Sequence, residues 1–150
     1  ELFTHSFLIR DPAKSIPSIY SRAPEWKREE FGYREHRALF DLVTDWQGFV
    51  PPVIDSDDLL EDPPRVVSAW CEAVGIPFLP EALTWEPGAR DEVSWYDDGS
   101  WHDKLAQSSG LTPQPRTYGK IDEAGPAVRE IYDDALPHYL HLHGQRVPAS

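Results

Sequence analysis

Three side chains near the start of the chain have the types and the spacing to bind a phosphate group. Arg10, Lys14 and Ser18 follow one another at intervals of four residues. An arginine guanidinium can donate two parallel hydrogen bonds to one phosphate, and a serine hydroxyl can add another donor. Lys14 and Ser18 share a face if the segment is helical. Arg10 and Ser18 are therefore the main candidates for a phosphate site, with Lys14 as a third. The alternative is an ordinary ion pair for Arg10 and a solvated surface for Ser18.

The residues around this trio predict how it is positioned. Ser6 to Ile9 is a short apolar run, which is typical of a strand buried on both faces of a parallel sheet. Asp11 can cap a helix by accepting from free backbone N–H groups, and Pro12 suits the first helical position. Arg10 would then lie at the carboxyl end of a strand, where open α/β sheets bind their ligands.

Further elements follow along the chain. Apolar residues at helical spacing predict a helix over 33–47, and a short apolar run predicts a strand at 53–54. Ser56 and Asp62 are expected as N-caps, with a helix continuing to about residue 74. A last helix begins at Pro126. We expect the two strands to lie parallel in one sheet, because each is followed by a capped helix. The apolar stripes of the two middle helices are predicted to be Leu39, Leu42, Val43 and Trp46, and Val67, Trp70, Cys71 and Val74.

The composition argues against several classes of function. The chain has 26 acidic residues against 14 basic ones, a formal net charge of −12, so binding to nucleic acid or to an anionic membrane is not expected. A single cysteine, Cys71, leaves no internal disulfide and no Cys-x-x-Cys site. No apolar stretch approaches the length of a membrane span, and no signal-peptide pattern is present. We expect one domain over residues 1–150, located in the cytoplasm.

Two groups of residues contain side chains that could bind a metal, but neither has the ligand spacing of a known kind of metal site. The acidic run at 55–58 resembles the start of an EF-hand loop, but Leu60 and Val66 stand where that loop needs Gly and Glu. Histidines near the C-terminus cannot all share one face of a helix, and a zinc site needs three or four ligands. No metal ligand is therefore predicted, although a small metal-binding module stays a third hypothesis, built on His138, His141 and His143.

Several longer segments resemble bacterial members of the sulfotransferase family in their order and spacing. Besides the eight-residue spacing of Arg10 and Ser18, they are Asp55–Leu60, Trp70–Phe78, Leu83–Gly88, Trp101-His102 and Ser108–Gly110. The resemblance implies an α/β, P-loop NTPase-like sulfotransferase fold with a parallel sheet, of which only the C-terminal part is present. The lack of any methionine and the buried-type strand at the very start favour the same interpretation.

The resemblance also implies a function. Members of the family transfer a sulfuryl group from 3′-phosphoadenosine 5′-phosphosulfate (PAPS) to an acceptor, here a small molecule with a hydroxyl or amine. On this chain Arg10 would clamp the 3′-phosphate of that donor, Ser18 would donate to it, and Lys14 is a weaker candidate. Trp101 would contact the adenosine region, with packing in the core as its alternative role.

The catalytic part of such an enzyme is missing from the chain. There is no G-x-x-x-x-G-K-[ST] or related loop to hold the transferring group, and neither the family's catalytic lysine nor its general base can be identified. No catalytic residue is therefore predicted here. We expect an N-terminal partner segment, a partner chain or a swapped homodimer to cover the first strand. A second hypothesis is that the chain is a non-catalytic binding or interaction domain of the same fold.

Overall fold

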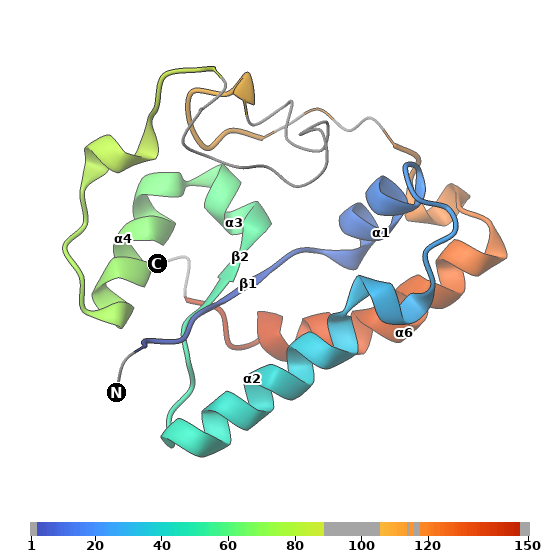
Figure 1. Cartoon of the computed structure of the whole chain (residues 1–150), viewed down its shortest axis with the longest axis horizontal. Coiled ribbons are helices and arrows are strands. Elements are labelled where there is room, and N and C mark those ends of the chain that lie inside the picture. Colours follow the sequence, from blue (N-terminus) through green and yellow to red (C-terminus); the bar gives the residue numbers. More distant parts are fainter. Residues whose placement is uncertain (1–2, 89–105, 114, 116–117, 148–150) are drawn as a thin grey trace.

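The computed structural model describes residues 3–88, 106–113, 115 and 118–147. Helices dominate these residues, and the strands are short (Figure 1). None of the helices in these ranges has the length and apolar content needed to cross a membrane. In chain order the elements are β1 (Phe7–Ile9), α1 (Pro12–Tyr20), η1 (Arg28–Phe31), α2 (Tyr33–Gln47), β2 (Val53–Asp55), α3 (Ser56–Glu61), α4 (Pro63–Val74), η2 (Pro80–Leu83), η4 (Ile121–Glu123) and α6 (Pro126–His143).

The two strands form a small parallel sheet, which confirms the predicted pairing. Phe7 lies opposite Val53, and Ile9 lies opposite Asp55. After α6 the chain adds a short extended segment to β2, where the Val147 N–H donates to the Val53 carbonyl over 2.8 Å. β2 therefore has neighbours on both edges. The outer edge of β1 is open, because no other strand among the described residues pairs with it.

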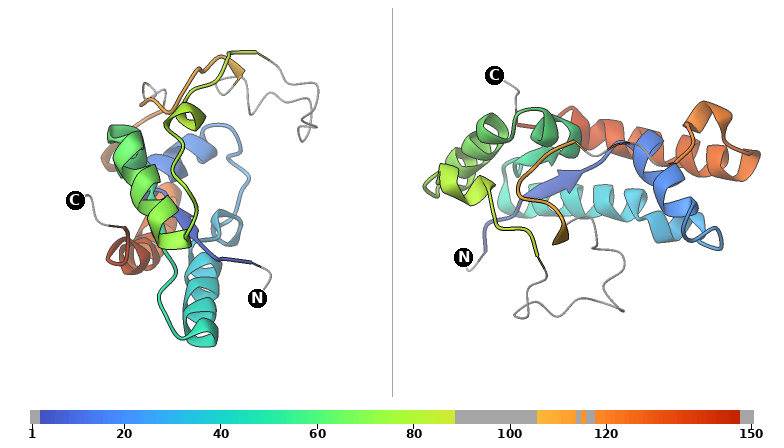
Figure 2. Two further views of the ribbon diagram at one scale, coloured as in Figure 1. Left: turned by 90° about the vertical axis from the view of Figure 1, so that its left-hand side faces the viewer. Right: turned by 90° about the horizontal axis from the view of Figure 1, so that it is seen from above.

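The main core lies between the strands and two long helices. α2 and α6 run side by side under β1 (Figure 2). The buried side chains of this cluster are Phe7, Ile9, Phe40, Val43, Val53, Tyr139 and Leu142. A second cluster joins α1 to α6, with Ile16 fully buried at its centre. Burying an aliphatic or aromatic side chain stabilises a fold by roughly 1.5–3 kcal/mol, so both clusters hold the carboxyl end of β1 firmly in place.

Carboxylates fix where three of the helices begin. Asp11 accepts from the N–H two residues on, over 2.8 Å, and caps α1; Asp62 accepts from the N–H three residues on, over 3.3 Å, and caps α4. Both caps were predicted. The expectation for Ser56 is wrong: the cap of α3 is Asp55, which accepts from the Asp57 N–H over 2.7 Å, and Ser56 is the first helical residue. Asp55 takes the N-cap position because it is the last residue of β2, where the backbone is still extended.

The apolar stripe predicted on α2 is only partly buried. Phe40 and Val43 pack in the core, whereas Leu39, Leu42 and Trp46 are 51%, 65% and 67% exposed. Periodicity identifies an apolar side of the helix, but that side is wider than the strip covered by β1 and α6. We call Leu39, Leu42 and Trp46 the apolar flank of α2.

Of the stripe predicted on α4, only Cys71 is fully buried, and Val66 is buried in place of its neighbour Val67. Val66 and Cys71 are buried, whereas Val67, Trp70 and Val74 are only partly covered. Cys71 is a free thiol inside the fold, as expected for a small core residue.

Candidate functional site

Arg10 lies directly after β1, at the carboxyl end of the strand. Its side chain forms no ion pair with any carboxylate of the described residues, so the ordinary ion pair considered from sequence is not found there. The backbone of Arg10 is fixed, because its carbonyl accepts a 2.9 Å hydrogen bond from the Tyr33 hydroxyl. A held backbone and an exposed guanidinium suit a residue that binds an anionic ligand.

Tyr33 ties the end of β1 to two helices. It is the first residue of α2, and its hydroxyl bonds both the Arg10 carbonyl and the hydroxyl of Ser15 in α1. Ser15 is itself buried. Burial raises the pKa of Tyr33 to about 12, while the hydrogen bond with Ser15 acts in the opposite direction. The phenol therefore remains protonated at neutral pH and can keep donating to Arg10.

A cavity of about 660 Å³ opens beside Arg10, and we call it the Arg10 cavity. It lies at the carboxyl ends of both strands, between α1 and α3. The described residues that line it are Arg10, Lys14, Ser56, Asp57, Leu60, Glu61, Pro113 and Tyr118. Its volume is in the range of small-molecule sites, and its place at this edge of a parallel sheet is the one at which α/β proteins bind ligands.

Lys14 reaches across the Arg10 cavity to the opposite wall. Its ammonium lies 2.8 Å from a carboxylate oxygen of Asp57, and both side chains are more than a third exposed. An ion pair at that exposure contributes about 0–1 kcal/mol. A ligand phosphate can therefore replace Asp57 as the partner of Lys14 at small cost.

A buried carboxylate, that of Asp55, fixes the start of α3, the helix that carries Asp57. Asp55 is 2% exposed and accepts from the Tyr139 hydroxyl over 2.8 Å as well as from the Asp57 N–H. Burial, and then the hydrogen bond and the charge of Asp55, raise the pKa of Tyr139, so this hydroxyl also stays a donor. α3 is thus fixed at its start relative to α6.

Sequence reasoning did not assign Asp57 and Glu61 to the site. From the sequence, the run 55–58 is weighed as a metal loop, as a helix start and as part of the family resemblance, but not as part of the phosphate site. A usable signal was present: Asp57 and Glu61 are four apart on a helix that directly follows the second strand, and parallel strands bring their carboxyl ends to one edge.

The other predicted site residues are placed less directly. Ser18 lies one turn beyond Lys14 on α1, is half-buried, and is not among the described residues that line the Arg10 cavity. Its carbonyl accepts from the Ser21 hydroxyl over 2.8 Å. Trp101 lies outside the described residues. The structure therefore brings Arg10 and Lys14 together and leaves Ser18 at a greater distance along the helix.

Two of the three C-terminal histidines, His141 and His143, have separate partners. His141 Nε2 lies 2.9 Å from Asp41 of α2, and His143 Nδ1 lies 3.3 Å from the guanidinium of Arg146. Within the described residues, no three potential metal-ligating side chains gather at one place. The hypothesis of a metal module on these histidines therefore finds no geometric support.

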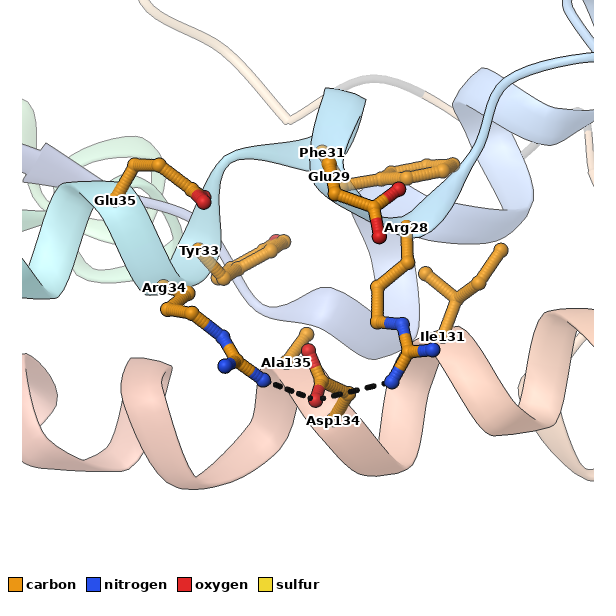
Figure 3. Close-up of a pocket in the computed structure, with 9 residues that line it drawn as sticks. All are labelled: Arg28, Glu29, Phe31, Tyr33, Arg34, Glu35, Ile131, Asp134 and Ala135. Carbon is orange, nitrogen blue, oxygen red and sulfur yellow. Dashed lines mark hydrogen bonds and ion pairs between the residues drawn. The ribbon is translucent and has the colours of Figure 1, made fainter.

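A second cavity, of about 400 Å³, lies between η1, the start of α2 and α6 (Figure 3). Arg28 and Arg34 both contact one oxygen of Asp134 there, at 3.5 and 2.9 Å. The rings of Phe31 and Tyr33 line the same space. Because both guanidiniums already share a carboxylate, this cavity is less suited to a phosphate than the Arg10 cavity.

A third cavity, of about 220 Å³, lies between β1, α1, α2 and α6 and is lined by Arg10, Tyr33 and His36 among others. Burial lowers the pKa of His36, so its imidazole is uncharged at neutral pH. Arg10 is then the fixed positive charge at the end of β1, and Lys14 is the second one nearby.

Comparison with known proteins decides the family. A family model described as a sulfotransferase domain matches residues 1–144. The chain belongs to the sulfotransferase family. Within the described residues, the fold of this domain is helix-rich with a small parallel sheet. No solved structure matches the chain.

Two relatives come from Arabidopsis thaliana. The chain is 31% identical over 137 residues to branched-chain-amino-acid aminotransferase-like protein 2, and 30% identical over 117 residues to branched-chain-amino-acid aminotransferase-like protein 1. These matches cover 90% and 76% of this chain but only 23% and 20% of the relatives. The chain thus spans less than a quarter of their length, and their names describe proteins that are mostly outside the match.

Proposed function

We propose that this chain forms the part of a PAPS-dependent sulfotransferase that binds the 3′-phosphate of the donor. The observation that supports it most is the position of Arg10. In a domain of the sulfotransferase family, it stands at the carboxyl end of a parallel strand, beside a cavity of about 660 Å³, with no carboxylate partner among the described residues.

The proposed roles follow from the positions of the side chains. Arg10 donates two hydrogen bonds to the 3′-phosphate, because its planar guanidinium matches two phosphate oxygens. Lys14 leaves Asp57 and adds a second positive charge. Ser18 donates a further hydrogen bond from the next turn of α1, which requires the phosphate to lie toward that end of the cavity. Trp101 contacts the adenosine.

The remainder of the proposed enzyme includes the loop that holds the transferring group, the catalytic lysine and the general base. We propose that residues 1–150 form one domain with this remainder, in a P-loop NTPase-like fold located in the cytoplasm, and that the acceptor is a small molecule with a hydroxyl or amine. An N-terminal segment is the preferred source of the missing loop, because a second copy of this chain would lack it as well.

The open edge of β1 is the proposed place for that segment. Leu8 of this strand is 59% exposed. Arg34 and Asp41 of α2 contact α6, so the apolar flank of α2 faces away from α6. A further strand with its helix would cover both features, and the carboxyl end of a parallel strand there would come next to Arg10.

Isothermal titration calorimetry tests the proposal on the ligand itself. Adenosine 3′,5′-bisphosphate should bind more tightly than adenosine 5′-monophosphate. Arg10→Ala should weaken the bisphosphate by about 2 kcal/mol, roughly 30-fold, and scarcely change the monophosphate. Arg37→Ala is the matched control, because it removes a half-buried arginine that pairs with Asp41 and is not among the described residues lining the cavity.

Two results would count against the proposed site. Equal affinity for the two nucleotides would mean that no 3′-phosphate site exists. A loss of affinity that is the same for both nucleotides in the Arg10 variant would leave this residue with a structural role.

A non-catalytic nucleotide-binding domain is the second candidate function. It is favoured by the lack of any loop for the transferring group in the sequence. Sulfuryl transfer from labelled PAPS to small hydroxyl and amine acceptors, measured on the natural full-length protein, separates the two candidates: binding without transfer supports the second.

A further inference from the structure

The charges that line the Arg10 cavity are unusual for a phosphate site. Among its described lining residues, two are positive, Arg10 and Lys14, and two are negative, Asp57 and Glu61. Asp57 and Glu61 are four apart in the sequence of α3, so both stand on one face of that helix. The two acids therefore face the two cations across the same cavity.

A bare polyanion is a poor ligand for such a wall. It must displace Asp57 from Lys14, which are 2.8 Å apart, and it then lies between two carboxylates. It also approaches a chain with a formal net charge of −12. A fully ionised inorganic polyanion such as pyrophosphate has no hydrogen-bond donor to offer the carboxylates, so its contacts with Asp57 and Glu61 stay repulsive.

A nucleoside phosphate meets the same wall differently. Its phosphate can bind Arg10, while ribose hydroxyls and an exocyclic amine can donate to carboxylates. Glu61 has no ion-pair or hydrogen-bond partner among the described residues and is free to accept. Beside it, Leu60, Pro113 and Tyr118 offer apolar and aromatic surface for a base.

We infer that Asp57 and Glu61 determine the specificity of the cavity, selecting a phosphate-bearing ligand that also carries hydrogen-bond donors over an inorganic polyanion. The inference rests on the proposed function, in which the Arg10 cavity binds the nucleotide part of the donor. It adds a reason why this cavity, in an acidic protein, admits a nucleotide in preference to an inorganic anion.

The test compares two ligands across matched variants by calorimetry. Adenosine 3′,5′-bisphosphate and inorganic pyrophosphate are titrated into the wild type, Glu61→Gln and Asp57→Asn. Glu81→Gln is the control, because it removes the same charge from an exposed position in η2, outside the cavity lining. The quantity compared is the ratio of the two dissociation constants, which cancels any general effect of net charge.

Glu61→Gln should change the affinity for the two ligands in opposite directions. Binding of the bisphosphate weakens roughly three- to tenfold because an ionised acceptor is lost, and pyrophosphate binds up to about fivefold more tightly because a like charge is gone. Asp57→Asn lowers the preference for the nucleotide as well, because Lys14 becomes available to both ligands. Glu81→Gln leaves the ratio unchanged.

An unchanged ratio in Glu61→Gln and Asp57→Asn would overturn the inference while leaving the proposed function intact, since the acids would then act by general repulsion alone. Failure of the wild type to bind the bisphosphate at all would overturn both. The two failures are distinguished by the wild-type titration.

Discussion

Tyr33→Phe is the substitution that tests most closely how the end of β1 is held. It removes one oxygen atom and keeps the ring, so packing in the core is preserved. Two hydrogen bonds disappear with that oxygen, one to the Arg10 carbonyl and one to the Ser15 hydroxyl. Ser15 is only 6% exposed, so its hydroxyl loses a partner without gaining full access to water.

The expected cost follows from these two contacts. A buried polar group left without a partner costs about 1–3 kcal/mol, and an ordinary hydrogen bond contributes about 1 kcal/mol. We expect Tyr33→Phe to lower the free energy of unfolding by about 2 kcal/mol, which for a chain of this size lowers Tm by roughly 4–8 °C. Urea unfolding followed by far-ultraviolet circular dichroism measures it, with an unchanged m-value.

Tyr132→Phe is the matched control. Tyr132 packs against the same cluster of α1 and α6, and its hydroxyl makes no hydrogen bond with the described residues. It should cost less than about 0.5 kcal/mol. In addition, Ser15→Ala should cost less in the Tyr33→Phe background than in the wild type, because its partner is already gone.

Equal costs for Tyr33→Phe and Tyr132→Phe would refute the reasoning. Strict additivity of the Ser15 and Tyr33 substitutions would refute it too. Either result would show that the phenol packs at the end of β1 without holding it.

Two further predictions concern stability. The pKa of Tyr33 is raised to about 12, so the native state keeps a proton that the unfolded chain releases near pH 10, and the free energy of unfolding should fall as the pH rises from about 10 to 12. Urea titrations should show a smaller fall in the free energy of unfolding of Tyr33→Phe over that window, and parallel curves for the two proteins would contradict this. Val43→Ala should lower the free energy of unfolding by about 2 kcal/mol and Leu42→Ala by less than about 0.5 kcal/mol, because Val43 is buried and Leu42 is 65% exposed. Thermal unfolding measures both, and similar costs would mean that the apolar flank is covered.

Local signals in the sequence predicted much of the scaffold. The apolar run at Phe7–Ile9, followed by Asp11 and Pro12, encodes a strand end and a helix start within a few residues, and short-range chemistry is enough to read it. The same holds for Asp62 at the start of α4. Parallel pairing of the strands followed from their capped helices.

The signals that failed depend on contacts distant in the sequence. Periodicity shows that Leu39 and Leu42 share an apolar side of α2, but only the positions of β1 and α6 decide which part of it is covered. Choosing Asp55 over Ser56 as the cap of α3 required the end of β2 to be known within one residue.

The candidate site shows the same difference between local signals, which the sequence contains, and long-range contacts, which it does not. Arg10 was identified because one segment contains both the strand end and the arginine. Its facing residues Asp57 and Glu61 come from the second strand–helix unit, more than forty residues later, and nothing in their local spacing names Arg10 as the neighbour. The sequence offers Lys14 only as a weaker third phosphate ligand, and its contact with Asp57 is visible only in three dimensions.

A crystal structure of the natural protein with adenosine 3′,5′-bisphosphate tests the central claim most directly. It should show the 3′-phosphate oxygens within hydrogen-bond distance of the Arg10 guanidinium, with the nucleoside in the Arg10 cavity beside Glu61. A nucleotide whose 3′-phosphate contacts other cations, such as Arg28 and Arg34 of the second cavity, would contradict the assignment of Arg10.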